Sequence, residues 1–215
     1  MPERLGILGG TFDPVHYGHL RLAEEARAAL GLDCVLWLPA GNPPHRAGPA
    51  ATADQRLEMV RLAVAGNPHF AVDAAEAQSP APSYTVATLQ RLRRELGADA
   101  SLVLLLGADA FATLPDWHRW QELFDLAHIA VATRPQHPLA PALLPAPLAA
   151  AWQSRRREGA ACLAKAAAGC IVAFALTALD IAATRIRTGV AQGASPRYLL
   201  PDPVLDYIDR HNLYR

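Results

Sequence analysis

Two histidines, His16 and His19, stand three residues apart near the start of the chain, after the glycine pair Gly9 and Gly10. A glycine pair lets the backbone turn sharply and approach a ligand closely, and a helix that begins here presents unpaired N–H groups to an anion. Gly18 leaves room beside the two imidazoles, which could donate hydrogen bonds to phosphate oxygens as charge develops. The pattern therefore favours a phosphate site. A structural turn is the main alternative, and zinc is disfavoured because the spacing and the acid of H-E-x-x-H are missing.

Short apolar runs alternate with amphipathic segments along the whole chain. The pattern predicts strands at 5–8, 34–38, 70–72, 102–106, 129–132 and 171–176. It predicts helices at 19–30, 54–65, 84–96, 184–190 and 203–211, with Asp54 as the N-cap of the second. Such alternation is typical of a parallel sheet with helices on both faces. We therefore expect an α/β fold with a Rossmann-like parallel sheet of five or six strands.

The same pattern bears on domain organisation and on the place of the site. We expect a single domain over 1–215, with 180–215 as its C-terminal helical portion and a partly helical, exposed segment at 137–160. In such sheets the ligand sits outside the carboxyl ends of the strands. Polar residues and glycines do collect at the predicted strand ends, in 9–19, 39–46, 107–117, 133–135 and 180–187.

Composition excludes several function classes. The 215 residues carry 20 basic and 20 acidic side chains. The chain therefore lacks the basic excess that is typical of a nucleic-acid-binding protein. The only lysine, Lys165, does not stand in a P-loop, so an anion site must use Arg, His and backbone N–H groups. The three cysteines include no C-x-x-C pair, and neither a signal peptide nor a membrane span is expected. These features predict a cytoplasmic protein.

The loop 9–19 reads GGTFDPVHYGH. It resembles the G-G-[ST]-F-D-P-x-H-x-G-H signature of bacterial nicotinate mononucleotide adenylyltransferases, whose H-x-G-H core is shared by a wider nucleotidyltransferase superfamily. Further similar segments follow in order: L-P-A-G-N-P-P-H-R at 38–46, P-S-Y-T at 82–85, G-A-D at 107–109, L-P-D-W at 114–117, D-I-A-A-T-R-I-R at 180–187 and the tail 199–214. One departure is Ala182, where the family usually has Ser; we expect Thr184 to cap the following helix instead.

The resemblance implies a Rossmann-like nucleotidyltransferase fold and a reaction in which nicotinate mononucleotide and ATP give nicotinate adenine dinucleotide and pyrophosphate. It implies catalytic roles for His16, His19 and Arg187. The ATP-binding residues it implies are Gly9, Gly10, Thr11, Phe12, His16, Gly18, His19, Gly107, Asp109, Ile181, Thr184 and Arg187. Those implied for nicotinate mononucleotide are Thr11, Asn42, His45, Arg46, Tyr84, Thr85, Asp109, Trp117, His118 and Arg134.

Other interpretations remain open for some of these residues. Taken alone, Arg187 is typical of a solvated helix charge, Trp117 could be a core anchor, and Arg46 and Arg134 could be surface charges. We expect Mg²⁺ to be carried by the ATP phosphates without protein ligands of its own, and Asp13 has no assigned role. A homo-oligomer is one outcome that the sequence leaves open. The alternative functions are adenylyl transfer to nicotinamide mononucleotide and non-catalytic sensing of a nucleotide, whereas a dehydrogenase is excluded because G-x-G-x-x-G is missing.

Overall fold

The computed structural model describes residues 4–43, 48–133 and 140–215. Their strands form one sheet of seven in the order β3-β2-β1-β4-β5-β7-β6. The strands are β1 Arg4–Gly10, β2 Cys34–Pro39, β3 Phe70–Val72, β4 Ser101–Gly107, β5 His128–Thr133, β6 Arg156–Arg157 and β7 Ile171–Ala175. The pairs β1–β4, β4–β5, β5–β7 and β6–β7 are parallel. The α/β prediction is confirmed. The predicted count of five or six strands is too low, because β6 consists of two arginines and carries no hydrophobic pattern.

The helices are α1 Tyr17–Leu30, α2 Ala53–Val64, α3 Thr85–Leu96, α4 Ala108–Ala112, α5 Leu123–Leu126, α6 Ala146–Arg155, α7 Ala183–Ala191 and α8 Asp202–Arg210. Asp54 is not the N-cap of α2. Thr52 takes that position and forms a capping box with Gln55, in which each side chain accepts the backbone N–H of the other residue. This arrangement satisfies two N–H groups that a helix start would otherwise leave unpaired. No helix within the described ranges is long and apolar enough to cross a membrane.

The chain divides into two compact units. The first, which we call the sheet unit, contains residues 4–8, 22–35 and 84–178, and the second, the signature unit, contains 9–21, 36–83 and 179–215, in each case outside the gaps given above. The expectation of a single domain over 1–215 stays a prediction.

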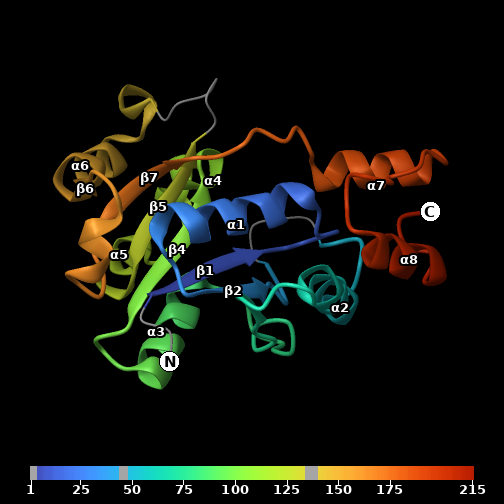
Figure 1. The fold of residues 1–215 in the computed structure, drawn as a ribbon, viewed down its shortest axis with the longest axis horizontal. Coiled ribbons are helices and arrows are strands. Elements are labelled where there is room, and N and C mark those ends of the chain that lie inside the picture. The colour runs from blue at the N-terminus through green and yellow to red at the C-terminus, as the bar shows by residue number, and fades with distance from the viewer. Residues whose placement is uncertain (1–3, 44–47, 134–139) are drawn as a thin grey trace. The chain divides into compact units, whose positions relative to one another are not determined.

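The core of the sheet unit is built on β4. Residues 101–106 of this strand are all buried, as the continuous apolar run predicts for a strand covered on both faces. Strands β4, β5 and β7 run side by side (Figure 1), and α3 packs against α5. Of the segment predicted to be partly helical and exposed, the structure describes 140–160. It contains the helix α6, but its exposure is only partial, because Leu148 and Trp152 are buried. The Trp152 ring meets Phe111 edge to face, with their centroids 5.8 Å apart.

Candidate active site

The glycine pair at the end of β1 leads into the loop that carries the histidines, in the signature unit. Phe12 has a left-handed backbone conformation there, with a φ of +50°, and its ring meets that of His19 edge to face at 5.1 Å between centroids. A Cβ on Gly10 would lie 2.9 Å from the Phe12 ring, so position 10 holds no side chain unless Phe12 moves. Gly9 is exposed, with open space where a Cβ would stand. The two glycines therefore serve different needs: Gly10 admits Phe12, and Gly9 leaves the backbone open.

The His16 and His19 rings stack, with centroids 3.7 Å apart and an interplanar angle of 25°. The Nδ1 of His19 accepts the backbone N–H of His16 at 3.3 Å, which leaves the proton of a neutral His19 ring on Nε2. Burial lowers the pKa of His16 to about 4. Burial, together with the neighbouring His16, lowers the pKa of His19 well below its ordinary value. Both imidazoles are therefore neutral at pH 7.

Gly18 fits the predicted role of leaving room beside the imidazoles. A Cβ at this position would lie 3.0 Å from Cε1 and Nδ1 of His16 and 3.8 Å from the carbonyl oxygen of Ile181. Ile181, which precedes α7, therefore lies beside the histidine loop. The Nδ1 atom of His16 is buried and has no hydrogen-bond partner among the described residues. A buried polar atom of this kind indicates a place where a ligand can bind.

Helix α7 begins at Ala183, with Ala182 as its N-cap and no side-chain hydrogen bond to its first turn. The prediction that Thr184 caps this helix is wrong, because Thr184 lies inside the first turn, where its side chain is exposed. The first N–H groups of a helix have no intrahelical partners. Without a capping side chain, they remain open to an anion.

Arg187 is held against the histidine loop rather than being a solvated helix charge. Its Nη1 donates to the backbone carbonyl oxygen of Asp13 at 2.7 Å and lies 3.8 Å from Oδ2 of the same residue. The Arg187 side chain remains 31% exposed. The structure therefore places Ile181 and Arg187 against the loop that carries His16 and Gly18. Part of the Arg187 guanidinium remains accessible.

The strand ends of β1 and β2 are joined by Arg56, a residue that no sequence pattern marks. Its guanidinium is buried and donates to the carbonyl oxygens of Thr11 at 2.7 Å, Ala40 at 2.5 Å and Gly41 at 3.0 Å. The predicted residue Thr11 is thus fixed through its backbone. Asn42 is exposed, and its carbonyl oxygen accepts the backbone N–H of Ser83. The predicted residues His45 and Arg46 lie outside the described residues.

Four of the predicted mononucleotide-binding residues lie in the sheet unit, around the start of α3 and the segment after α4. Tyr84 is the N-cap of α3, with no side-chain hydrogen bond to the helix, and no acidic residue stands in the first turn, which begins at Thr85. The rings of Tyr84 and His118 lie 4.5 Å apart, centroid to centroid. Trp117 is half-buried at the end of a 3-10 turn over Leu114–Asp116. The helix start and the aromatic rings of this region are typical of a site for a flat anionic group.

Gly107 and Asp109 stand where β4 ends. Gly107 is the N-cap of the short helix α4, and Asp109 lies in its first turn with an exposed side chain. This position agrees with the expectation that Asp109 faces a ligand from the carboxyl end of a strand. Arg134, predicted after β5, lies outside the described residues.

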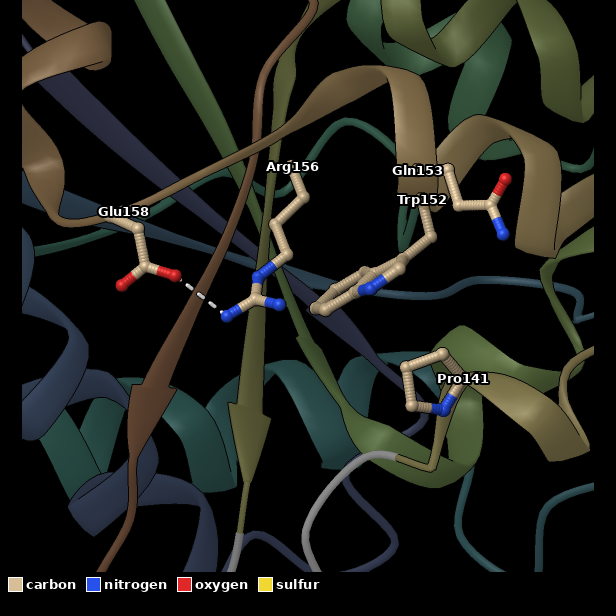
Figure 2. Close-up of a pocket in the computed structure, with 5 residues that line it drawn as sticks. All are labelled: Pro141, Trp152, Gln153, Arg156 and Glu158. Atoms are coloured by element: carbon tan, nitrogen blue, oxygen red, sulfur yellow. Dashed lines mark hydrogen bonds and ion pairs between the residues drawn. The ribbon is translucent and has the colours of Figure 1, made fainter.

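A hollow of about 410 Å³ opens elsewhere in the sheet unit (Figure 2). Its lining residues are Pro141, Trp152, Gln153, Arg156 and Glu158. Figure 2 shows the Arg156 guanidinium beside the Trp152 ring, 5.4 Å from its centroid, while it donates to Glu158 at 2.7 Å. The described members of the predicted site do not line this hollow, and its one cation is already paired, so we do not place the active site there.

Comparison with known proteins adds the family. A family model described as cytidylyltransferase-like matches residues 7–189. A protein of Dechloromonas aromatica named "Probable nicotinate-nucleotide adenylyltransferase" is 60% identical over 215 residues, which cover 100% of this chain and 99% of that relative. The chain belongs to the nicotinate-nucleotide adenylyltransferase family. The resemblance drawn from the sequence motifs is confirmed.

Further relatives agree with this family. A protein of Acidithiobacillus ferrooxidans with the same name is 49% identical over 213 residues, covering 99% of this chain and 96% of the relative. Among solved structures, a Plasmodium falciparum nicotinic acid mononucleotide adenylyltransferase complexed with APC aligns with a TM-score of 0.72 and 13% identity, covering 98% of this chain and 96% of that one. At this identity the likeness establishes the fold, which is the one expected of a nicotinate-nucleotide adenylyltransferase.

Proposed function

We propose that this chain transfers the adenylyl group of ATP to nicotinate mononucleotide, giving nicotinate adenine dinucleotide and pyrophosphate. The 5′-phosphate oxygen of the mononucleotide attacks the α-phosphorus of ATP, and the bond from that phosphorus to the pyrophosphate oxygen breaks. The observation that carries the proposal is the 60% identity over the full length of a relative with that name. The neutral, stacked histidine pair of the signature unit supports it.

The histidine pair acts by donating hydrogen bonds where charge builds up. Nε2 of His19 carries its proton, because its Nδ1 accepts the N–H of His16. Nδ1 of His16, buried without a described partner, is free to bond a phosphate oxygen. No covalent intermediate is formed, so positioning and charge stabilisation supply most of the catalysis. An uncharged pair keeps its N–H donors available until the phosphates bind, and these donors stabilise the negative charge that develops on the phosphate oxygens in the transition state.

The uncapped start of α7 and the guanidinium of Arg187 hold the β- and γ-phosphates of ATP. Both are donors of fixed direction: the N–H groups follow the axis of α7, and Arg187 is oriented by its bond to the Asp13 carbonyl oxygen. The missing serine at Ala182 removes one hydroxyl but leaves these backbone donors in place. Thr184, exposed in the first turn, adds a hydroxyl to the same group.

The start of α3 selects the acid over the amide. The first N–H groups of this helix, at Thr85 and Val86, have no intrahelical acceptors, and a carboxylate accepts two such bonds, whereas the NH₂ group of an amide would face another donor. Trp117 stacks on the pyridine ring, with Tyr84 and His118 beside it. Asp109 accepts hydrogen bonds from a ribose. Asn42, His45, Arg46 and Arg134 are proposed, from the family resemblance alone, to bind the same mononucleotide.

Mg²⁺ is proposed to arrive on the phosphates of ATP. The carboxylate of the histidine loop, Asp13, accepts hydrogen bonds on both oxygens, from the N–H groups of Ala50 and Ala51 and from the Tyr214 hydroxyl. A metal bound there would displace these donors, so the loop fits an ion that rides on the substrate. Such an ion neutralises phosphate charge. We place the reaction in the cytoplasm, where the three thiols, none of them in a disulfide, stay reduced.

The test is pyrophosphate release by the purified protein with ATP and Mg²⁺, offering nicotinate and nicotinamide mononucleotides in parallel. We expect a strong preference for the acid, and loss of the activity in His19→Ala. Comparable rates on both substrates would keep adenylyl transfer and refute the selection of the carboxylate by α3. ATP binding without release from either substrate would refute the proposal and favour a nucleotide sensor.

A further inference from the structure

The side-chain carboxylate of Asp13 is buried in the histidine loop and binds no substrate in the chemistry proposed above. Asp13 is 5% exposed. Its Oδ2 accepts the N–H of Ala50 at 2.8 Å, and its Oδ1 accepts the N–H of Ala51 at 3.2 Å and the hydroxyl of Tyr214 at 2.7 Å. A buried charge held by three donors is fixed in place, because each lost partner leaves it undersolvated.

Tyr214, the penultimate residue, supplies the only side-chain hydroxyl among these donors. Its backbone is left-handed, with a φ of +64°, and its hydroxyl reaches the histidine loop from beyond the end of α8. Burial, and then the bond to Asp13, raise the pKa of this phenol above its ordinary value. The hydroxyl therefore keeps its proton and donates throughout the neutral pH range.

Residue 13 in turn holds Arg187 at two points. The Nη1 of Arg187 donates to the carbonyl oxygen of Asp13 at 2.7 Å and lies 3.8 Å from the carboxylate oxygen Oδ2. The direction of the guanidinium thus depends on the position of residue 13, and residue 13 is fixed in part by Tyr214. All three residues belong to the signature unit.

We infer that Tyr214 is a positioning residue for the ATP phosphates, acting through Asp13 on Arg187. This inference rests on the proposed function, since it assigns Arg187 to those phosphates. Tyr214 then supports the triphosphate site without contacting the substrate itself.

The first test compares Tyr214→Phe with Tyr207→Phe, which removes a hydroxyl from α8 that makes no bond to Asp13. We expect Tyr214→Phe to lower kcat/KM for ATP about 10-fold, the size of one lost hydrogen bond to a charged group, while KM for nicotinate mononucleotide changes less than about twofold. Tyr207→Phe should match the wild type. Rates are normalised to folded protein, measured by circular dichroism. Equal losses for both substrates would assign Tyr214 a general structural role and overturn the inference.

The second test is a double-mutant cycle with Arg187→Lys, which keeps the charge and removes the fork of the guanidinium. If Tyr214 acts through Arg187, Tyr214→Phe should cost less than about twofold in the Arg187→Lys background. A full 10-fold loss in both backgrounds would overturn the inference. Failure of the wild type to make the dinucleotide would refute the proposed function instead, and the cycle would then be run on ATP binding by calorimetry.

Discussion

The imidazole rings of His16 and His19 stack at 3.7 Å, and a backbone N–H from the first residue fixes the tautomer of the second. Two rings stacked this closely repel each other if both are protonated to the positively charged form, and burial lowers the pKa of each. The pair is therefore uncharged before ATP binds. Its hydrogen-bond capacity is kept for the phosphates.

His19→Ala should lower kcat by about 10²–10³-fold, the usual cost of removing one donor to a developing oxyanion. His19→Gln, which keeps an N–H donor, should recover part of the loss. The measurement is steady-state release of pyrophosphate at saturating substrates. A variant within about threefold of the wild type would exclude His19 as the transition-state donor.

Acid should destabilise the unliganded protein over a defined window. The folded pKa of His16 is about 4, below the value near 6.5 of an unfolded histidine. Between these two values the unfolded state binds a proton that the native state does not, so the free energy of unfolding falls as the pH falls from about 6.5 to about 4. The full drop is about 3 kcal/mol from this residue, and His19 acts in the same direction. Urea unfolding of the wild type and of His16→Asn across this window measures the pH dependence of the free energy of unfolding. The same pH dependence in both proteins would contradict the lowered pKa of His16.

Gly18→Ala should impair catalysis more than stability. The added Cβ would stand 3.0 Å from two atoms of the His16 ring, so the ring has to shift by a few tenths of an ångström. We expect kcat to fall about 10-fold, because a small displacement of a positioned donor is costly. The control is Gly66→Ala, where a Cβ would meet nothing within 4 Å. Equal activity of the two variants would show that the ring has room to spare.

Arg56→Met should lower the free energy of unfolding by about 3 kcal/mol. The substitution removes the buried guanidinium and leaves the partly buried carbonyl oxygens of Thr11, Ala40 and Gly41 without this donor. Arg61→Met is the matched control on the same helix, since its ion pair with Glu58 is half exposed and should contribute less than about 0.5 kcal/mol. Chemical denaturation of both variants decides; similar midpoints would contradict the role given to Arg56.

The strands and the histidine loop could be predicted because the residues that determine them lie close together in the sequence. The continuous apolar run of β4 predicts a strand buried on both faces. The tightest contacts of Gly10 and Gly18 are with Phe12 and His16, each two residues away in the sequence. The N-cap predicted for α2 is wrong although the sequence carries the signal: Thr52 and Gln55 have the spacing of a capping box, which Asp54 lacks. The cap expected at Thr184 was wrong by two residues, within the usual uncertainty of a helix boundary.

Arg56 and Tyr214 could not be predicted, because their partners are distant in sequence. An arginine in an amphipathic helix is normally solvated, and nothing local indicates that Arg56 reaches carbonyl oxygens of residues 11, 40 and 41. Likewise, no local pattern indicates that Tyr214, which follows α8, bonds to Asp13. The spatial meeting of Asp13 with Ala50, Ala51 and Tyr214 is a property of the folded signature unit.

The bond between Asp13 and Tyr214 joins residues 201 positions apart. The histidine motif and its last anchor therefore come from distant segments that only folding brings together. A molecule in which the segment after α8 has locally unfolded carries the complete motif without the hydroxyl that steadies it. Local unfolding at that segment therefore loosens the histidine loop although no residue of the motif itself has unfolded.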